Sequence, residues 1–178
     1  MFFFQHTAFP MERMWSPWRS KHIERMAEPS SGASEPGSVF TRMVAQDRDA
    51  DNLILWRGPS VFVVMNLYPY NNGHLMIVPY REVARYEDLT AEEQVDMAHT
   101  LARCLRWLRQ ALSPEGFNVG LNLGLAAGAG IPEHVHMHVV PRWRADTNFM
   151  PTIAEVKVVP EALEETYRKL RAAIETAG

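Results

Sequence analysis

The stretch HVHMHVVPRW (residues 134–143) decides how this chain is interpreted, because histidine and apolar residues alternate along it. Residues two apart on a β-strand point to the same face, at intervals of about 6.6 to 6.8 Å. We therefore expect a strand over residues 134–140 that presents the imidazoles of His134, His136 and His138 on one face. The apolar residues between them would point into the core.

Three interpretations of this row of imidazoles are open from the residues alone. It can be a polar strand face that is open to water. It can be a metal site, because three neutral imidazoles and a water form an open zinc centre, but no cysteine is near and Glu133 would point to the opposite face. It can also be a site of covalent catalysis, in which one imidazole attacks an electrophile and its neighbours bind an anionic substrate. Gly124, Gly128 and Gly130 just upstream allow close approach of the backbone to a ligand, which favours a built site over a solvated face.

The rest of the chain predicts a mixed fold. Short apolar, β-branched runs indicate strands, and a capping box formed by Thr90 and Glu93 marks the start of a long helix. In chain order we expect strands at 52–56, 61–65 and 74–78, a helix from Thr90 to Leu112, strands at 117–123 and 134–140, and a helix that begins at Pro160. This order lacks the regular alternation of a doubly wound sheet. We predict an α+β fold: a mostly antiparallel five-stranded sheet with one long helix and a C-terminal helix.

Both expected helices are amphipathic. Apolar residues at three- and four-residue spacing predict the face of each helix that packs on the sheet. That face is Val95, Ala98, Ala102, Leu105, Leu108 and Leu112 in the long helix, and Leu163, Tyr167, Leu170 and Ile174 in the C-terminal helix.

Length and composition bound the class of protein. A chain of 178 residues with 47% hydrophobic and 22% charged residues is typical of one globular domain. We expect an N-terminal arm at residues 1–26, a loop rich in Pro, Gly and Ser at 27–37, and the main domain at 38–178. The net charge of −3 offers no basic field for nucleic acid.

The sequence also argues against a membrane-bound or exported protein. No stretch reaches the roughly 18 apolar residues of a membrane span, and the start of the chain lacks the pattern of a signal peptide. The single cysteine, Cys104, cannot form an internal disulfide, which suits a reducing compartment. We therefore predict a cytoplasmic protein without nucleic-acid or membrane partners.

The run HVHMHVV at 134–140 matches the His-φ-His-φ-His-φ-φ signature, in which φ is apolar, of the histidine-triad (HIT) proteins. NNGHLMIVP at 71–79 resembles the segment that bears the family's fourth histidine, and 141–151 resembles the tail of its bacterial diadenosine-polyphosphate branch. The resemblance covers roughly residues 11–170. It implies a HIT-like fold and a homodimer whose two sheets join edge to edge, with the long helix near the interface.

The same resemblance implies a role for each histidine. His136 would be the nucleophile that attacks the α-phosphorus of a nucleotide and forms a nucleotidyl-histidine. His138 would contact the phosphate and the bridging oxygen, His134 would orient His136, and His74 would complete the cluster from the adjacent strand. An imidazole suits this attack because it adds no negative charge to a substrate whose oxygens repel anions. The implied substrates are dinucleoside polyphosphates of the diadenosine tetraphosphate class.

The resemblance also implies where the substrate would lie. Asn66 matches the position that holds the ribose, Asn122 matches the polar residue that faces the phosphate, and Phe62 is the candidate to lie against the base. The glycine-rich segment up to Gly130 would let backbone N–H groups approach the phosphates. Turn or strand-end capping is the alternative role of both asparagines. No cofactor and no metal ion is expected to take part.

The chain departs from the family pattern at two places. Many relatives carry Cys-x-x-Cys for a structural zinc where this chain has Ser38-Val39-Phe40-Thr41, so we expect no zinc site. Some branches place Gln or Ser, which help the leaving group or water, where this chain has Gly130 and Ile131. The group that accepts the nucleotidyl unit therefore stays open.

Four functions remain as hypotheses. The first is a nucleotidyl hydrolase or transferase that acts on dinucleoside polyphosphates. The second is a phosphorylase that uses inorganic phosphate in place of water on the same substrate. The third is a nucleotide-binding scaffold protein without turnover, which the presence of all four histidines disfavours. The fourth is a metal-dependent hydrolase, which a metal analysis would separate from the others.

Overall fold

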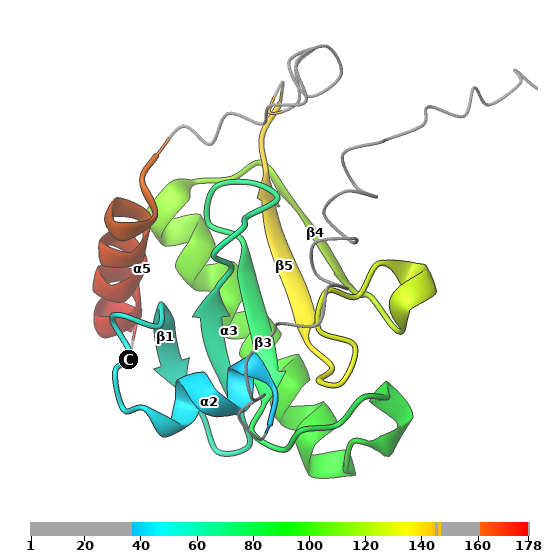
Figure 1. Ribbon diagram of the computed structural model, residues 1–178. Helices are drawn as coiled ribbons and strands as arrows, with labels where there is room; N and C mark the ends of the chain where they lie inside the picture. Colours follow the sequence, from blue (N-terminus) through cyan, green and yellow to red (C-terminus); the bar gives the residue numbers. More distant parts are fainter. Residues whose placement is uncertain (1–36, 145, 147–160, 178) are drawn as a thin grey trace, which may run out of the picture. The chain divides into compact units, whose positions relative to one another are not determined.

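The structure is a computed structural model, and it describes residues 37–144, 146 and 161–177 (Figure 1). The elements in chain order are α2 (Val39–Ala45), β1 (Ile54–Arg57), β2 (Val61–Met65), β3 (Leu75–Pro79), the 3-10 helix η1 (Tyr86–Asp88), α3 (Ala91–Leu112), β4 (Gly116–Leu121), the 3-10 helix η2 (Leu125–Ala127), β5 (Met137–Arg142) and α5 (Leu163–Ala177). The arm expected at residues 1–26, and all but the last residue of the loop expected at 27–37, lie outside the described residues.

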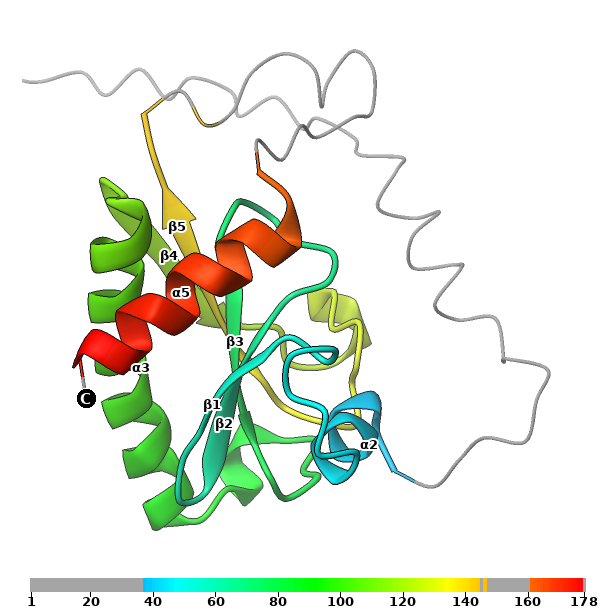
Figure 2. The ribbon, with the colours of Figure 1, turned by 90° about the vertical axis from the view of Figure 1, so that its left-hand side faces the viewer.

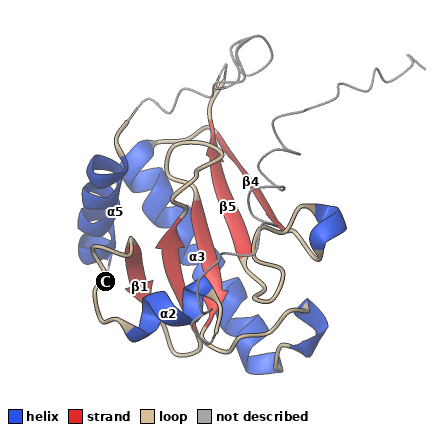
Figure 3. Cartoon of the chain, viewed as in Figure 1, coloured by secondary structure: helices blue, strands red, loops and turns tan. Residues whose placement is uncertain are grey.

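The five strands form one antiparallel sheet in the order β1-β2-β3-β5-β4 (Figure 3). β5, which carries the end of the histidine run, lies between β3 and β4 and has a partner along both edges. β1 and β4 are the edge strands. The prediction of an α+β fold, with a five-stranded antiparallel sheet, a long helix and a C-terminal helix, is confirmed.

The two faces of the sheet are covered by different helices. α3 and α5 pack on one face, and α2 lies on the other (Figure 2). Strand alternation divides the apolar residues between two cores. On β2, Val61 and Val63 belong to the core with α3 and α5, whereas Phe62 and Val64 belong to the core with α2. The histidines share the α2 side, since the ring of Phe40 on α2 contacts two of them.

α3 has the expected bounds. The Thr90 hydroxyl accepts the Glu93 N–H, and the Glu93 carboxylate accepts the Thr90 N–H, so the capping box is complete. Ser113, in a left-handed conformation, ends the helix. Start and stop signals that act within four residues can be recognised in a sequence, which explains this agreement.

The apolar face expected for α3 is wrong in its N-terminal half. Val95, Ala98 and Ala102 are exposed, and 55% of Val95 is accessible to solvent. The buried residues of the helix are instead Glu93, Met97, Thr100, Cys104, Trp107 and Leu108. Two apolar stripes run along this helix, and the stripe with the larger side chains is buried because it removes more apolar area from water.

The strand that carries the histidines is shorter than expected. β5 begins at Met137, so only His138 of the three histidines lies in it. The ladder between β3 and β5 ends at the pair of Ile77 and Met137. The start of the strand expected at 134–140 is therefore wrong.

Other hydrogen bonds replace the ladder beyond this pair. The Pro79 carbonyl accepts a bond from the ring of His134, and the Val135 N–H donates to the Val83 carbonyl at 2.7 Å. The alternation of faces nevertheless continues, because Val135 and Val139 both lie in the core on the α3 side. The expectation that the histidines and their apolar neighbours point to opposite faces is thus confirmed.

α5 packs as expected. Its residue Leu170 is fully buried, and Leu163, Tyr167 and Ile174 pack against the same core. The expected start of this helix at Pro160 lies outside the described residues. Among the helices that the structure describes, none has the length and apolar character needed to cross a membrane.

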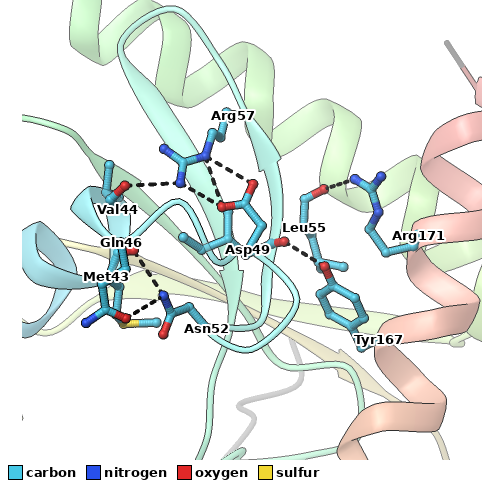
Figure 4. A network of polar contacts seen from close by, with 10 residues as sticks. Met43, Val44, Gln46, Asp49, Asn52, Leu55, Arg57, Tyr167 and Arg171 are labelled. Carbon is cyan, nitrogen blue, oxygen red and sulfur yellow. Dashed lines mark hydrogen bonds and ion pairs between the residues drawn. The ribbon is translucent and has the colours of Figure 1, made fainter.

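Hydrogen bonds fix the edge strand β1 to the helices beside it (Figure 4). Arg171 of α5 donates to the Leu55 carbonyl at 2.8 Å. Arg57 forms an ion pair with Asp49 at 2.6 Å and donates to the Val44 carbonyl in the last turn of α2. The bond from Arg57 to Val44 holds α2 beside the sheet, on the side where the histidines lie.

Candidate active site

Four histidines come together on the α2 side of the sheet. His138 lies on β5, His74 immediately precedes β3, and His134 and His136 lie in the segment that leads into β5. All four are buried, with at most 8% of any one exposed. Hydrogen bonds join them in two pairs, His74 with His138 and His134 with His136. The structure therefore brings together the four histidines that the sequence singled out.

His74 and His138 belong to a chain of hydrogen bonds that starts at the main chain. The Tyr70 N–H donates to Nδ1 of His74 at 3.0 Å, so a neutral His74 carries its proton on Nε2. That Nε2–H donates to Nδ1 of His138 at 2.9 Å. Because Nδ1 of His138 accepts, the neutral ring has its proton on Nε2. These two hydrogen bonds therefore make Nε2 of His138 an N–H donor.

The hydrogen bond between His134 and His136 leaves Nε2 of His136 with an available lone pair. Nδ1 of His136 donates to the main-chain carbonyl of His134 at 2.8 Å, since a carbonyl can only accept. The neutral His136 ring then has its lone pair on Nε2. The ring centroids of His136 and His138 are 4.8 Å apart, with their planes at 75°. A nucleophilic nitrogen and an N–H donor therefore occur on adjacent rings.

His134 itself is held at both ring nitrogens. Its Nε2 donates to the Pro79 carbonyl at 2.8 Å, and its Nδ1 lies 2.6 Å from Oγ of Ser38. The ring is fully buried. It cannot turn without breaking one of these bonds, which fits the expected role of orienting His136.

Burial keeps these imidazoles uncharged. It lowers the pKa of His134, His136 and His138 from the ordinary value of 6.5, and it outweighs the hydrogen bonds to carbonyls that raise the pKa of the first two. For His138, burial and then the neighbouring His136 lower the pKa to about 4. At neutral pH His136 is therefore an uncharged base.

Two aromatic side chains that no sequence pattern singled out flank the histidines. Phe40 meets the rings of His134 and His136 edge-on, at centroid distances of 5.5 and 5.2 Å. Tyr70 stacks on His138 at 5.5 Å and is 44% exposed, so it covers this ring toward solvent. The Phe40 contacts join positions more than 90 residues apart, and no local spacing could mark them.

The two asparagines expected to bind substrate both lie beside the cluster. Nδ2 of Asn122 is 3.4 Å from Nε2 of His138. Oδ1 of Asn66 accepts the Tyr68 N–H at 2.9 Å, and its Nδ2 is 3.4 Å from Nδ1 of His74. Asn66 thus has the capping role that was its alternative, in addition to its place beside the histidines.

The other two expected substrate residues have different surroundings. Phe62 is completely buried, and its ring stacks on Tyr80 at a centroid distance of 5.5 Å. A nucleotide base could contact Phe62 only after its neighbours moved. Gly130 lies exposed in the loop between η2 and His134.

Comparison with known proteins agrees with this geometry. The family model described as the HIT domain matches residues 47–145, which is more than half of the chain. The chain belongs to the HIT family. This HIT protein is 44% identical over 163 residues to the AP-4-A phosphorylase of Mycobacterium tuberculosis, an alignment that covers 90% of this chain and 83% of that protein. It is 35% identical over 93 residues to the asymmetrical bis(5'-nucleosyl)-tetraphosphatase of Schizosaccharomyces pombe, which covers 52% of this chain and 50% of that protein.

A solved structure extends the agreement to the fold. The crystal structure of a Zn-bound histidine triad family protein from Mycobacterium smegmatis superposes on this HIT protein with a TM-score of 0.65 and 28% sequence identity. The superposition covers 80% of this chain and 98% of that one. The HIT-like fold expected from the resemblance is confirmed.

Ser38 and Thr41, which stand where many relatives carry the cysteine pair, do not fit a structural zinc ion. In the part of the chain that the structure describes, no three His, Cys, Asp or Glu side chains are grouped so that they could hold a metal ion. The Ser38 hydroxyl bonds to His134, and the Thr41 hydroxyl bonds to Glu82. Zinc prefers thiolate, imidazole and carboxylate ligands, and the two hydroxyls are none of these. That no metal takes part in the reaction stays a prediction.

Proposed function

We propose that this HIT protein cleaves dinucleoside polyphosphates of the diadenosine tetraphosphate class at the α-phosphorus, through a covalent nucleotidyl group on His136. One observation carries the proposal: the unprotonated Nε2 of His136 stands beside a His138 ring that has its proton on Nε2. Attack on phosphorus needs a nucleophile together with a donor for the charge that develops on oxygen.

In the first step, the lone pair on Nε2 of His136 forms a bond to the α-phosphorus. The bond from this phosphorus to the bridging oxygen breaks, and its electron pair stays on the oxygen. With diadenosine tetraphosphate the leaving group is ATP. His138 donates a hydrogen bond to the leaving oxygen but transfers no proton, because a neutral imidazole is a very weak acid. The electrostatic support comes from donors that are in place before the reaction.

Asn122 and the loop before His134 supply further donors in this proposal. Nε2 of His138 and Nδ2 of Asn122 are both donors in the tautomer derived above, so they form no hydrogen bond at 3.4 Å and the amide can donate to a phosphate oxygen instead. Gly124 and Gly128 have φ angles of 80° and 84°, which glycine adopts easily, and such a loop can direct backbone N–H groups at an anion. Contacts of Asn66 with the ribose and of Gly130 with a phosphate are proposed from the resemblance alone.

The second step distinguishes two activities. Attack by water forms a new bond from phosphorus to oxygen, breaks the bond from phosphorus to Nε2, and releases AMP and a proton to solvent. Attack by inorganic phosphate breaks the same bond and releases ADP, and both reactions restore the lone pair on His136. Water needs no binding site of its own, but the similarity to a protein named AP-4-A phosphorylase extends over 90% of this chain. The similarity to the tetraphosphatase extends over 52%. We therefore favour inorganic phosphate as the acceptor, with hydrolysis as the second candidate.

Product analysis in isotope-labelled water tests this proposal. Diadenosine tetraphosphate is incubated with the protein, with and without inorganic phosphate. We expect ATP and unlabelled ADP, and turnover that requires phosphate. Labelled AMP with ATP would identify a hydrolase with the same first step. Symmetric cleavage to two ADP without any phosphate requirement would contradict attack at the α-phosphorus, and binding without turnover would indicate a nucleotide-binding scaffold protein.

We also propose that this HIT protein is a homodimer in the cytoplasm, with its catalytic domain starting at residue 38. β4 is an edge strand whose Val119 is 43% exposed, and Val95 is exposed on α3. Pairing with a second copy would cover such an edge. Light scattering should then give twice the 20.3 kDa mass of the chain, whereas a particle of that single mass at micromolar concentration would contradict the dimer.

A further inference from the structure

Ser38, the residue that precedes α2, contacts the histidine cluster directly. Its Oγ is 2.6 Å from Nδ1 of His134, and the two residues are 2% and 0% exposed. They are 96 positions apart in the chain. A short hydrogen bond between two buried side chains fixes both of them, because neither can exchange its partner for water.

The proton in this bond comes from Ser38. Nε2 of His134 donates to the Pro79 carbonyl at 2.8 Å, so Nε2 carries the ring proton and Nδ1 has the lone pair. The Ser38 hydroxyl must then donate to Nδ1. The same oxygen accepts the Thr41 N–H at 3.2 Å as the N-cap of α2. Oγ1 of Thr41 is also 3.2 Å from this oxygen, but Nδ1 of His134 at 2.6 Å is the closer acceptor, so the hydroxyl points at His134.

Glu82 fixes the main chain of Ser38. Its Oε2 accepts the Ser38 N–H at 2.7 Å and the Thr41 hydroxyl at 3.0 Å. The bond from the Ser38 N–H and then that from the Thr41 hydroxyl lower the pKa of Glu82, so it stays a carboxylate at neutral pH. The position of the Ser38 hydroxyl is thus set by bonds on two sides of the residue.

We propose that Ser38 is a positioning residue of this active site, whose hydroxyl fixes the orientation and the tautomer of His134. The inference rests on the function proposed for the histidine cluster. Its effect on the reaction passes through the main chain, because the His134 carbonyl accepts Nδ1–H of His136 at 2.8 Å and so determines which nitrogen of His136 attacks. The two bonds to the His134 ring hold this carbonyl in place, so without the Ser38 hydroxyl it can shift, and Nε2 of His136 then loses its alignment with the phosphorus. A displacement of about 1 Å in a reacting group can lower a rate on the order of a hundredfold.

The variant Ser38→Gly tests this inference, because glycine is nearly as good an N-cap as serine but has no hydroxyl. The matched control is Thr90→Gly, which removes the N-cap hydroxyl of α3, a helix on the sheet face opposite the histidines. We measure kcat and KM for diadenosine tetraphosphate, and the NMR signals of the His134 ring nitrogens. For Ser38→Gly we expect kcat to fall by at least about tenfold and KM to change by less than about threefold. The Nδ1 signal of His134 should move toward that of a nitrogen that accepts no hydrogen bond. The control variant should change neither kcat nor the His134 signals.

Three results would overturn the inference: a kcat of Ser38→Gly within tenfold of the wild type, a loss of kcat with unchanged His134 signals, or an equal loss in Thr90→Gly. The last two would reduce Ser38 to a structural role. If Ser38→Gly does not fold, Ser38→Ala is judged by the same criteria. If the wild-type protein does not turn over the substrate, the proposed function fails, and the His134 signals alone decide whether Ser38 fixes the tautomer.

Discussion

At the scale of single residues, the site depends on where the ring protons lie. The Tyr70 N–H determines the tautomer of His74 and thereby that of His138, and the His134 carbonyl determines that of His136. Both sets of hydrogen bonds start at main-chain groups, and a main-chain N–H can only donate while a carbonyl can only accept. The spacing of the histidines predicted that they would come together. It could not predict which nitrogen attacks, because that depends on partners from other parts of the chain.

The pH dependence of kcat/KM tests the state of His136. This parameter reports the ionisation of the free enzyme. Attack needs the neutral ring, and burial lowers the pKa of His136 from 6.5. We therefore expect kcat/KM for diadenosine tetraphosphate to stay level through neutral pH and to fall only at pH values below 6.5. An acid limb with its midpoint above 6.5 would show that the ring is not held neutral.

At the scale of elements, local signals gave reliable predictions and long-range packing did not. The bounds of α3 and β2 follow from caps, turns and alternation within a few residues. α2 was not expected, because it has only seven residues and is held in place by contacts such as that of Ser38 with His134. That Phe62 lies against the base stays a prediction, and the structure buries its ring beside Tyr80. An apolar residue on a strand has the same pattern whether it faces a ligand or a covering helix.

The loop that carries His74 gives a prediction at this scale. Gly73 has a φ of +72°, and a Cβ atom there would lie 2.4 Å from Cδ1 of Leu112 on α3. Gly73→Ala should therefore reduce the free energy of unfolding by on the order of 2 kcal/mol, as measured by denaturant titration. Activity should fall as well, because His74 is displaced. Gly116→Ala is the control, since its Cβ would meet nothing within 4 Å, and it should change stability by less than about 1 kcal/mol. Equal effects of the two substitutions would contradict this account.

At the scale of the whole molecule, the sheet has most of the apolar core on one face and the candidate active site on the other. The face under α3 and α5 carries the larger apolar core, and the opposite face holds the histidines beside α2. Burial keeps the imidazole of His136 uncharged at neutral pH, as the proposed attack requires. It also makes the fold sensitive to acid, because the unfolded chain binds protons that the folded protein excludes.

Stability should therefore decrease as the pH falls below 6.5, the ordinary pKa of the three histidines whose folded pKa is lowered. Above that pH the unfolded chain gains no extra protons from them, so they have no effect there. For His138 the loss continues down to about pH 4 and is on the order of 3 kcal/mol. Denaturant titrations between pH 7 and 5 measure the slope, in a range where the carboxylates with lowered pKa values do not yet titrate. His138→Asn should reduce this slope, and an unchanged slope would contradict the burial of a neutral ring.

In the proposed mechanism His136 carries the nucleotidyl group, and this covalent intermediate can be trapped. The wild-type protein and His136→Gly are mixed with diadenosine tetraphosphate, quenched in alkaline denaturant because a bond from imidazole to phosphorus breaks in acid, and digested for mass spectrometry. We predict one adenylyl group on His136 in the wild type, none in the variant, and no turnover by the variant. An adenylyl group on another residue would contradict the claim. So would turnover by His136→Gly within about tenfold of the wild type, which corresponds to about 1.4 kcal/mol of barrier.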